Sequence, residues 1–143
     1  MRKCLECLAL LLKRHQIRFC SNKCQSNHKY HQYVLVWKSN NEIGIKGIVT
    51  KNISRYLKRY LLEKYGEKCS SCGWNKKHST TGRVPVEVDH IDGNGENNSE
   101  NNLRLLCPNC HSLTSNFRNL NKGRGRIWRK KNILKISKEL LRT

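Results

Sequence analysis

The stretch from Val86 to His111, VEVDHIDGNGENNSENNLRLLCPNCH, decides the fold of this chain. Its first three residues alternate between apolar and charged side chains, which predicts a strand with one buried face. The strand delivers an Asp-His pair, Asp89 and His90, at its end. A neutral imidazole is a suitable general base near neutral pH, and His90 is the candidate. This pair is therefore the first candidate for chemistry.

The rest of the stretch predicts a return strand and a short helix. Residues 93–102 read as an Asn- and Gly-rich turn, and Leu103–Leu106 as the second strand. Pro108 opens a helix, because proline is tolerated in a first turn, and His111 falls in the first or second turn of that helix. The predicted order is strand, loop, strand and helix, with His90 and His111 facing each other.

Two sets of four cysteines account for all eight cysteines of the chain. One set frames the stretch above with the spacing C-x2-C-x34-C-x2-C, and Gly73 follows its first pair. The members of this set are Cys69, Cys72, Cys107 and Cys110. Four thiolates arranged as two close pairs can converge on a tetrahedral zinc ion, so we predict a structural zinc site here.

The other cysteine set lies near the N-terminus with the spacing C-x2-C-x12-C-x3-C. Its members are Cys4, Cys7, Cys20 and Cys24. This set predicts a zinc knuckle that opens a helix, although Leu8 stands where such knuckles often have a glycine for their tight turn. Free or oxidation-prone thiols are the alternative.

The composition explains why metal sites would matter to folding. Only 36% of the 143 residues are hydrophobic, so a large apolar core is not available. Small chains with thin cores usually need metal or disulfide staples. Zinc binding can contribute on the order of 10 kcal/mol to folding, which would offset a thin core. We therefore expect a small α+β fold that is stapled by two zinc ions.

The charge of the chain indicates a polyanionic partner. The net charge is +19, from 29 basic and 10 acidic residues, which makes nucleic acid the first candidate and anionic membrane the competitor. Half of the acidic residues nevertheless fall between Glu87 and Glu100. A bound divalent cation would account for negative charge at that position, and a solvated polar loop is the alternative.

We read no export signal at the N-terminus. Met1, Arg2 and Lys3 precede an apolar run of only five residues, Leu8–Leu12, and no small-residue cleavage site follows. No segment is apolar enough over a sufficient length to span a bilayer, so we expect no membrane partner. We expect a cytoplasmic protein, because cysteine clusters in a reducing compartment hold metal more often than they form disulfides.

Two longer helices are predicted outside the central stretch. The first runs from about residue 23 to residue 37, where apolar residues recur at spacings of four and three. The second runs from Ser54, a candidate N-cap, to Tyr65, with Gly66 as its C-terminal stop. The polar, glycine-containing segment between these helices reads as a linker.

The central stretch resembles the HNH nuclease motif, a hairpin and a helix around a bound metal ion. In that reading His90, Asn102 and His111 are the three letters of the name, and Asp89 is the accompanying metal ligand. The resemblance runs from Cys69 to about residue 116. It is specific because several residue types agree at once, and it implies a ββα-metal nuclease domain.

A wider resemblance is to the small, free-standing HNH endonucleases of bacteriophages. The segments that carry it are FCSNKC, YLLEKYGEKCSSCGW, VEVDHIDGN and NLRLLCPNCHSLT, and it extends to about Arg126. It implies cleavage of double-stranded DNA, often in the service of a mobile element (homing). It further implies a phage-encoded protein in a bacterial host cell, and a single active site per chain is compatible with a monomer or a homodimer.

The resemblance also implies a role for each site residue. His90 is the general base that activates water, while Asp89 and His111 hold a divalent ion such as Mg²⁺ or Mn²⁺ beside the phosphate. Asn102 is structural: its side-chain amide braces the loop and helps to fix His90. On a regular strand Asp89 would point to the side opposite His90, so the resemblance implies that the strand ends there and that Asp89 turns onto the metal.

These predictions divide the chain into four parts: a Cys4 knuckle with its helix (1–38), a linker (39–53), a nuclease domain (54–120) and a basic tail (121–143). Nine basic residues and one acidic residue lie between Lys122 and Arg142, which suits contact with DNA phosphates. The predicted DNA-binding residues are Lys122, Arg124, Arg126, Arg129, Lys130 and Lys131. A solvated basic tail is the alternative.

Two other functions fit part of the pattern. A non-catalytic zinc protein that binds nucleic acid would share the charge and the cysteines, but it would need no exchangeable divalent ion. A zinc module for a protein partner explains the charge poorly. Salt dependence separates this last function from the others, because contact with several phosphates makes affinity fall steeply with salt.

Overall fold

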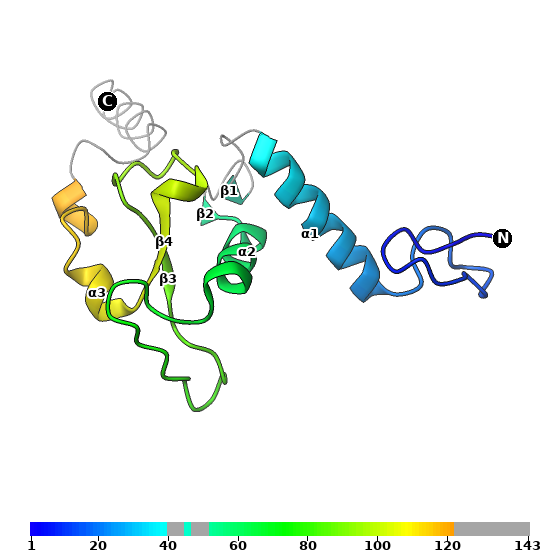
Figure 1. The fold of residues 1–143 in the computed structure, drawn as a ribbon, viewed down its shortest axis with the longest axis horizontal. Coiled ribbons are helices and arrows are strands. Elements are labelled where there is room, and N and C mark those ends of the chain that lie inside the picture. The colour runs from blue at the N-terminus through cyan, green and yellow to red at the C-terminus, as the bar shows by residue number, and fades with distance from the viewer. Residues whose placement is uncertain (40–44, 47–51, 122–143) are drawn as a thin grey trace, which may run out of the picture. The chain divides into compact units, whose positions relative to one another are not determined.

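The computed structural model of the chain describes residues 1–39, 45–46 and 52–121 (Figure 1). The chain divides into two compact units, Met1–Asn40 and Asn41–Thr143. We call them the N-terminal unit and the C-terminal unit. Each unit contains one of the two cysteine sets.

The N-terminal unit consists of a cysteine-bearing loop followed by a long helix (Figure 1). An isolated antiparallel bridge joins Lys3 to Leu10 and closes the loop. The helix α1 (Asn22–Ser39) begins where the Ser21 hydroxyl accepts a hydrogen bond from the Cys24 amide, as a capping serine does. The helix predicted for residues 23–37 is confirmed and is slightly longer at both ends. No helix in the described ranges is long and apolar enough to cross a membrane.

The C-terminal unit opens with a short antiparallel ribbon inside the segment that reads as a linker. Strand β1 (Ile45–Lys46) pairs with β2 (Asn52–Ile53). Strands of two residues are too short to produce a periodic signal, so neither strand is predicted from the sequence. The rest of residues 40–51 lies outside the described residues.

The helix α2 (Arg55–Tyr65) has the boundaries that its flanking residues predict. The Ser54 hydroxyl accepts a hydrogen bond from a first-turn amide at 3.2 Å, and Gly66 ends the helix with a φ of 81°. Leu57 and Leu61, four residues apart, are fully buried. This apolar stripe fixes the helix against the rest of the unit.

A β-hairpin followed by a short helix occupies the centre of the C-terminal unit. Strand β3 (Glu87–His90) pairs antiparallel with β4 (Leu103–Leu106), with Asp89 opposite Arg104. The 3₁₀ turn η1 (Glu100–Asn102) leads directly into β4. Both strands predicted from the sequence are confirmed, so the chain has the predicted α+β character.

Helices α2 and α3 lie on opposite sides of this hairpin (Figure 1). Helix α3 (Pro108–Ser112) contacts both strands, whereas α2 contacts β4. The Cys107 Sγ accepts a hydrogen bond from the Cys110 amide at 3.4 Å and so caps α3, while Pro108 fills the first turn as predicted. A second 3₁₀ turn, η2 (Arg118–Asn121), ends the described part of the chain.

The apolar core beneath α3 is small and includes two cysteines. Cys69, Leu106 and Cys107 are buried together, and Trp74 and Cys110 pack against them. Thiol side chains thus provide much of the buried surface that joins the two ends of this segment. Any ion held by these cysteines would contribute directly to the stability of the hairpin and of α3.

Candidate active site

Two residues of β3 face α3, and both lie beside His111. Side chains alternate between the faces of a strand, so Glu87 and Asp89 project to the same side of β3. The Glu87 Oε2 lies 2.8 Å from the Nδ1 of His111, and the Asp89 Oδ1 lies 3.7 Å from the Nε2 of the same ring. His111 therefore stands between two carboxylates, with one at each ring nitrogen.

The nearer carboxylate determines which nitrogen of the neutral His111 ring carries the proton. A carboxylate can only accept hydrogen bonds, so Nδ1 donates to Glu87 and the lone pair of Nε2 faces Asp89. Neighbouring ligand atoms on an octahedral Mg²⁺ ion, each about 2.1 Å from it, lie roughly 3.0 Å apart. Asp89 Oδ1 and His111 Nε2 are 3.7 Å apart, so these two atoms would need to approach each other by roughly 0.7 Å to share such an ion.

Arg104 holds the second oxygen of Asp89. The Arg104 Nε donates to Asp89 Oδ2 at 2.7 Å, and the two residues are direct partners across the hairpin. Asp89 is only 6% exposed, and a buried carboxylate needs such a partner. Arg104 was not among the predicted site residues. The hairpin register is the signal that would identify it, because the register places residue 104 opposite residue 89.

The expectation that the strand ends at Asp89 is wrong, because β3 continues through His90. The chain turns immediately afterwards, where the Gly93 amide donates to the His90 carbonyl at 2.9 Å. Asp89 instead reaches α3 because it shares a strand face with Glu87. The two imidazoles, which the pattern predicted to face each other, have different partners: the Nε2 of His90 lies 3.1 Å from Asn98 Oδ1.

Asn102 lies inside the loop that joins β3 to β4. Its Oδ1 accepts from the Asp92 amide at 3.0 Å, and its Nδ2 donates at 2.8 Å to both Asp92 Oδ1 and the Asn97 carbonyl. Burial raises the pKa of Asp92, but hydrogen bonds from Asn97, the Asn94 amide and Asn102, together with nearby His90, outweigh burial and hold that pKa below its usual value. Asn102 thus braces a loop that contains a charged carboxylate.

The four cysteines of the C-terminal unit converge, with all four sulfur atoms within 4.8 Å of one another. Two sulfurs bound to a tetrahedral zinc ion at about 2.3 Å each lie about 3.8 Å apart. The separation between the Cys72 and Cys107 sulfurs is 3.9 Å, so the set fits a metal ion of this kind. Both the amide and the hydroxyl of Ser70 donate to the Leu105 carbonyl, which ties the first cysteine pair to β4.

Within this cluster the protein already favours one thiolate. Burial raises the pKa of Cys69, but hydrogen bonds from the amides of Cys107, Cys72 and Ser71 outweigh burial and lower that pKa to about 6. The thiol of Cys110 shares hydrogen bonds first with Cys72 and then with Cys107, and these raise its pKa to about 12. A metal ligand must be deprotonated, so the lowered pKa of Cys69 favours metal binding by its thiolate.

The cysteines of the N-terminal unit converge in the same way. The Cys20 sulfur lies 3.5 Å from that of Cys7 and 3.4 Å from that of Cys24. The Cys7 amide lowers the pKa of Cys4 to about 6, whereas hydrogen bonding to Cys24 raises the pKa of Cys20 to about 12. Among the residues that the structure describes, no third group of His, Cys, Asp or Glu is as compact as these two.

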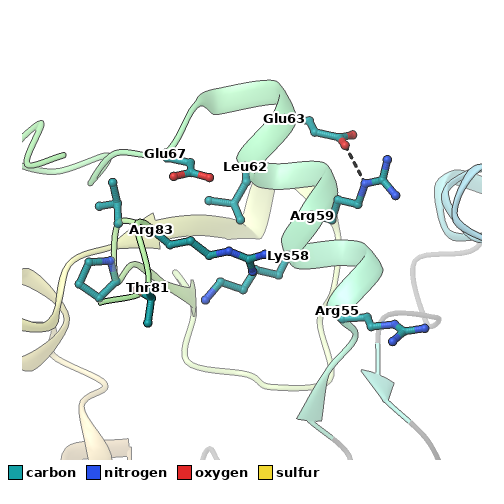
Figure 2. A pocket seen from close by; sticks show the side chains of 10 residues that line it. Arg55, Lys58, Arg59, Leu62, Glu63, Glu67, Thr81 and Arg83 are labelled. Atoms are coloured by element: carbon teal, nitrogen blue, oxygen red, sulfur yellow. Dashed lines mark hydrogen bonds and ion pairs between the residues drawn. The ribbon is translucent and has the colours of Figure 1, made fainter. Parts of the chain in front are cut away.

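A cleft of about 660 Å³ lies between α2 and the segment that precedes β3 (Figure 2). Lys58 and Arg83 line it, and the Lys58 ammonium donates to a backbone carbonyl at 2.7 Å. Arg59 pairs with Glu63 at 2.7 Å (Figure 2). None of the predicted catalytic residues lines this cleft. The Asp89–His111 pair thus lies outside this cleft.

The DNA-binding residues predicted in the basic tail lie outside the described residues. Their predicted role therefore stays a prediction. The remaining site residues fall into two groups in the structure. Asp89 and His111 are brought together with Glu87 and Arg104 on one side of the hairpin. His90 and Asn102 belong to the loop end of the hairpin, each with different loop partners.

Part of the chain is similar in sequence to known proteins. Residues 69–117 match the family model described as HNH endonuclease. The chain is also similar to the H-N-H endonuclease F-TflIV of Escherichia phage T5, at 48% identity over 60 residues. That stretch is 40% of this chain and 24% of the phage protein, so the chain spans about a quarter of the relative's length. No solved structure matches the chain. The segment that contains Asp89, His90 and His111 thus matches the HNH endonuclease family, and the match covers residues 69–117 of the chain.

Proposed function

We propose that the protein is a metal-dependent DNA endonuclease that hydrolyses phosphodiester bonds. The observation that carries this proposal is the 3.7 Å approach of Asp89 Oδ1 to His111 Nε2, inside the segment that matches the HNH endonuclease family. A net charge of +19 supports a polyanionic substrate, for which we propose double-stranded DNA. Likeness to a phage endonuclease supports a phage-encoded enzyme in a bacterial host cell, for which we propose a homing-type role in the cytoplasm.

The proposal involves two kinds of metal site. Each cysteine cluster would hold a structural zinc ion, in keeping with four sulfur ligands and separations of 3.4–3.9 Å between sulfurs. Asp89 and His111 would hold an exchangeable divalent ion, Mg²⁺ or Mn²⁺, with one oxygen and one nitrogen ligand. An ion bound there would stabilise the negative charge that develops on the phosphate and on the leaving oxygen.

The residues of the chain supply the remaining steps of hydrolysis. His90, as the general base, would take a proton from the attacking water. Glu87 and Arg104 would orient His111 and Asp89 respectively, because each occupies the atom of its partner that faces away from the proposed ion. Asn102 would keep the loop after β3 in a single conformation through its contacts with Asp92 and Asn97.

A plasmid assay tests this function directly. Supercoiled DNA is incubated with the zinc-loaded protein and a series of added divalent ions, and nicked and linear products are followed in time. We expect His90→Ala to lower the cleavage rate by on the order of a hundredfold or more while DNA binding is kept. His78→Ala, at an exposed position in the same unit, is the matched control. Full activity of the His90→Ala variant would remove His90 from its proposed role.

The order of products also bears on the number of subunits. One active site hydrolyses one strand at a time, so a monomer should accumulate nicked circles before linear DNA. A homodimer with two sites at one locus should yield linear DNA with little nicked intermediate. Both arrangements are compatible with the proposed chemistry, and the time course distinguishes them.

A non-catalytic, zinc-dependent nucleic-acid-binding protein is the second candidate. One observation favours it: Asp89 and His111 both have protein partners without an added ion, in Arg104 and Glu87. Such a protein would retain two zinc ions through extensive washing and bind DNA, but no added Mg²⁺ or Mn²⁺ would produce cleavage. The same plasmid assay, combined with a metal count, decides between the two functions.

A further inference from the structure

A buried asparagine in the hairpin loop contacts the proposed general base. Asn98 has no exposed surface, and its Oδ1 lies 3.1 Å from His90 Nε2. Burying an amide without hydrogen bonds is costly, so a fully buried asparagine is expected to use its polar atoms. Asn98 was not among the residues that the sequence pattern singled out, because no motif letter falls on it.

The orientation of the Asn98 amide is set by its second contact. Its Nδ2 donates to the Glu96 carbonyl at 3.4 Å, which leaves Oδ1 as the atom that faces His90. An amide oxygen can only accept, so the Nε2 of His90 must carry the hydrogen in this contact. In the neutral ring the basic lone pair is then on Nδ1.

The neighbours of Asn98 hold it in place from both sides. The Asn97 side chain donates to Asp92 Oδ2 at 2.7 Å, and the Asn97 carbonyl accepts from Asn102 at 2.8 Å. On the other side, the Ser99 hydroxyl donates to Asn97 Oδ1 at 2.7 Å. The backbone around Asn98 is therefore fixed by the same network that contains Asn102, and Asn98 connects this network to the His90 ring.

We propose that Asn98 is a positioning residue that anchors the Nε2–H of His90 and thereby presents Nδ1 as the nitrogen that receives the proton from water. The inference rests on the proposed function for the identity of that proton, but the anchoring contact itself does not depend on cleavage. It gives Asn102 an indirect role: Asn102 fixes the loop, and Asn98 fixes the imidazole.

The test uses the full-length, zinc-loaded chain labelled with ¹⁵N at histidine, without an added catalytic ion. Proton–nitrogen spectra are recorded at a pH of about 8, above the ordinary pKa of histidine. Comparison with His90→Ala assigns the His90 ring among the six histidines. We expect a protonated Nε2 whose hydrogen exchanges slowly with water, and an unprotonated Nδ1. A His90 ring protonated at Nδ1 alone would overturn the proposal without any variant of Asn98.

Two substitutions of similar size then separate anchoring from simple packing. Asn98→Leu removes the acceptor, so the slowly exchanging Nε2–H signal should disappear and the cleavage rate should fall by on the order of ten- to a hundredfold, with DNA affinity unchanged. Asn98→Asp keeps an acceptor at the same position, so the Nε2–H signal should persist. Should Asn98→Leu fail to fold, the wild-type and Asn98→Asp spectra still decide the question.

The possible results separate this inference from the proposed function. If the wild-type protein cleaves DNA but Asn98→Leu retains both the Nε2–H signal and the full cleavage rate, the endonuclease stands and the role of Asn98 is wrong. If no metal ion produces cleavage but the signal responds to the two substitutions as expected, the anchor is real and the nuclease assignment fails.

Discussion

The two cysteine clusters are built alike, yet only one of them adjoins a candidate active site. In each cluster one thiol has a pKa of about 6 and another a pKa of about 12. Each also has a histidine Nδ1 that meets a glutamate, His31 with Glu6 at 3.0 Å and His111 with Glu87 at 2.8 Å. Among the described residues, the His111 ring alone of these two has a second carboxylate beyond its other nitrogen, where Asp89 lies at 3.7 Å.

From this difference we infer that each cysteine cluster has a structural role, and that function depends on the side chains that the cluster holds in place. In the N-terminal unit the cluster joins a loop to a long helix whose three lysines, Lys23, Lys29 and Lys38, are exposed. In the C-terminal unit it joins the hairpin to a helix of five residues that contains His111. The four predictions below test this division of roles, beginning with the largest expected effect.

Replacing the last cysteine of each cluster should separate the two roles most clearly. Cys110 and Cys24 are both half-buried residues of a helix's first turns. Each serine variant should lose one metal equivalent, and up to about 10 kcal/mol of metal-linked folding free energy in its unit. We expect Cys110→Ser to abolish cleavage, because His111 is the next residue, and Cys24→Ser to retain it. Metal counts and plasmid cleavage measure both, and loss of cleavage in Cys24→Ser would contradict the division.

The two histidines should differ almost as much. His111→Ala removes a proposed ligand of the exchangeable ion, so cleavage should fall by on the order of a hundredfold and should respond weakly to added Mn²⁺. His31→Ala removes a histidine with the same kind of glutamate contact near the other cluster. The rate of plasmid cleavage should be unchanged in that variant. An equal loss of cleavage rate in the two variants would mean that the contact between His111 and Asp89 has no role in catalysis.

A third prediction concerns Glu100, whose carboxylate joins the hairpin loop to α2 in the C-terminal unit. Burial raises the pKa of Glu100, but hydrogen bonds from Lys64, Tyr65 and Tyr60 outweigh burial and hold that pKa below its usual value. A depressed carboxyl pKa adds stability that is present above the usual pKa of glutamate and is lost as pH falls through the folded-state pKa.

Glu100→Gln should therefore cost about 1 kcal/mol in the free energy of unfolding at neutral pH, and the difference from wild type should shrink in acid. Denaturant unfolding at several pH values measures this. Glu63→Gln, which breaks an exposed ion pair with Arg59 on α2, is the matched control and should change little. A pH-independent difference for Glu100→Gln would show that its charge is not the source of the stability.

The smallest expected effect concerns the turn that follows the first cysteine pair in each cluster. Leu8 has a φ of 61° and Gly73 a φ of 74°, and each donates its amide to the carbonyl of the first cysteine. The left-handed conformation costs a residue with a side chain about 1 kcal/mol. Leu8→Gly should raise the free energy of unfolding of the N-terminal unit by less than about 1 kcal/mol. Gly73→Ala should lower the free energy of unfolding of the C-terminal unit by about the same amount, and denaturant unfolding measures both. A loss of stability in Leu8→Gly, or a gain in Gly73→Ala, would disprove the equivalence of the turns.

Local features of the sequence predicted most of the fold. The strand Leu103–Leu106 is confirmed at both of its ends, and Ser54 and Gly66 bound α2 as their capping chemistry predicts. The two cysteine sets converge as their spacing predicts. These features depend on residues close in sequence, or on a ligand set whose chemistry brings distant residues together.

The contacts that the sequence did not predict are those made across loops. Arg104 reaches Asp89 only through the register of a hairpin whose turn length the pattern left open. Asn98 and Glu100 lie in an Asn-rich loop in which many residues could fill the same role, so nothing in the pattern distinguishes those that point inward. The strand β3 runs through His90 and does not end at Asp89 as the resemblance implies. Asp89 faces the active-site side because α3 covers the strand face that carries it, and that packing is not visible in the sequence.

The brevity of α3 has a consequence for the proposed function. Its five residues include Cys110 and His111, and Cys107 caps its first turn, so a proposed zinc ligand and a proposed ligand of the exchangeable ion are neighbours in one helical turn. Loss or oxidation of these cysteines would then be expected to displace the imidazole of His111. The availability of zinc in the cell and the capacity to cut DNA should therefore rise and fall together.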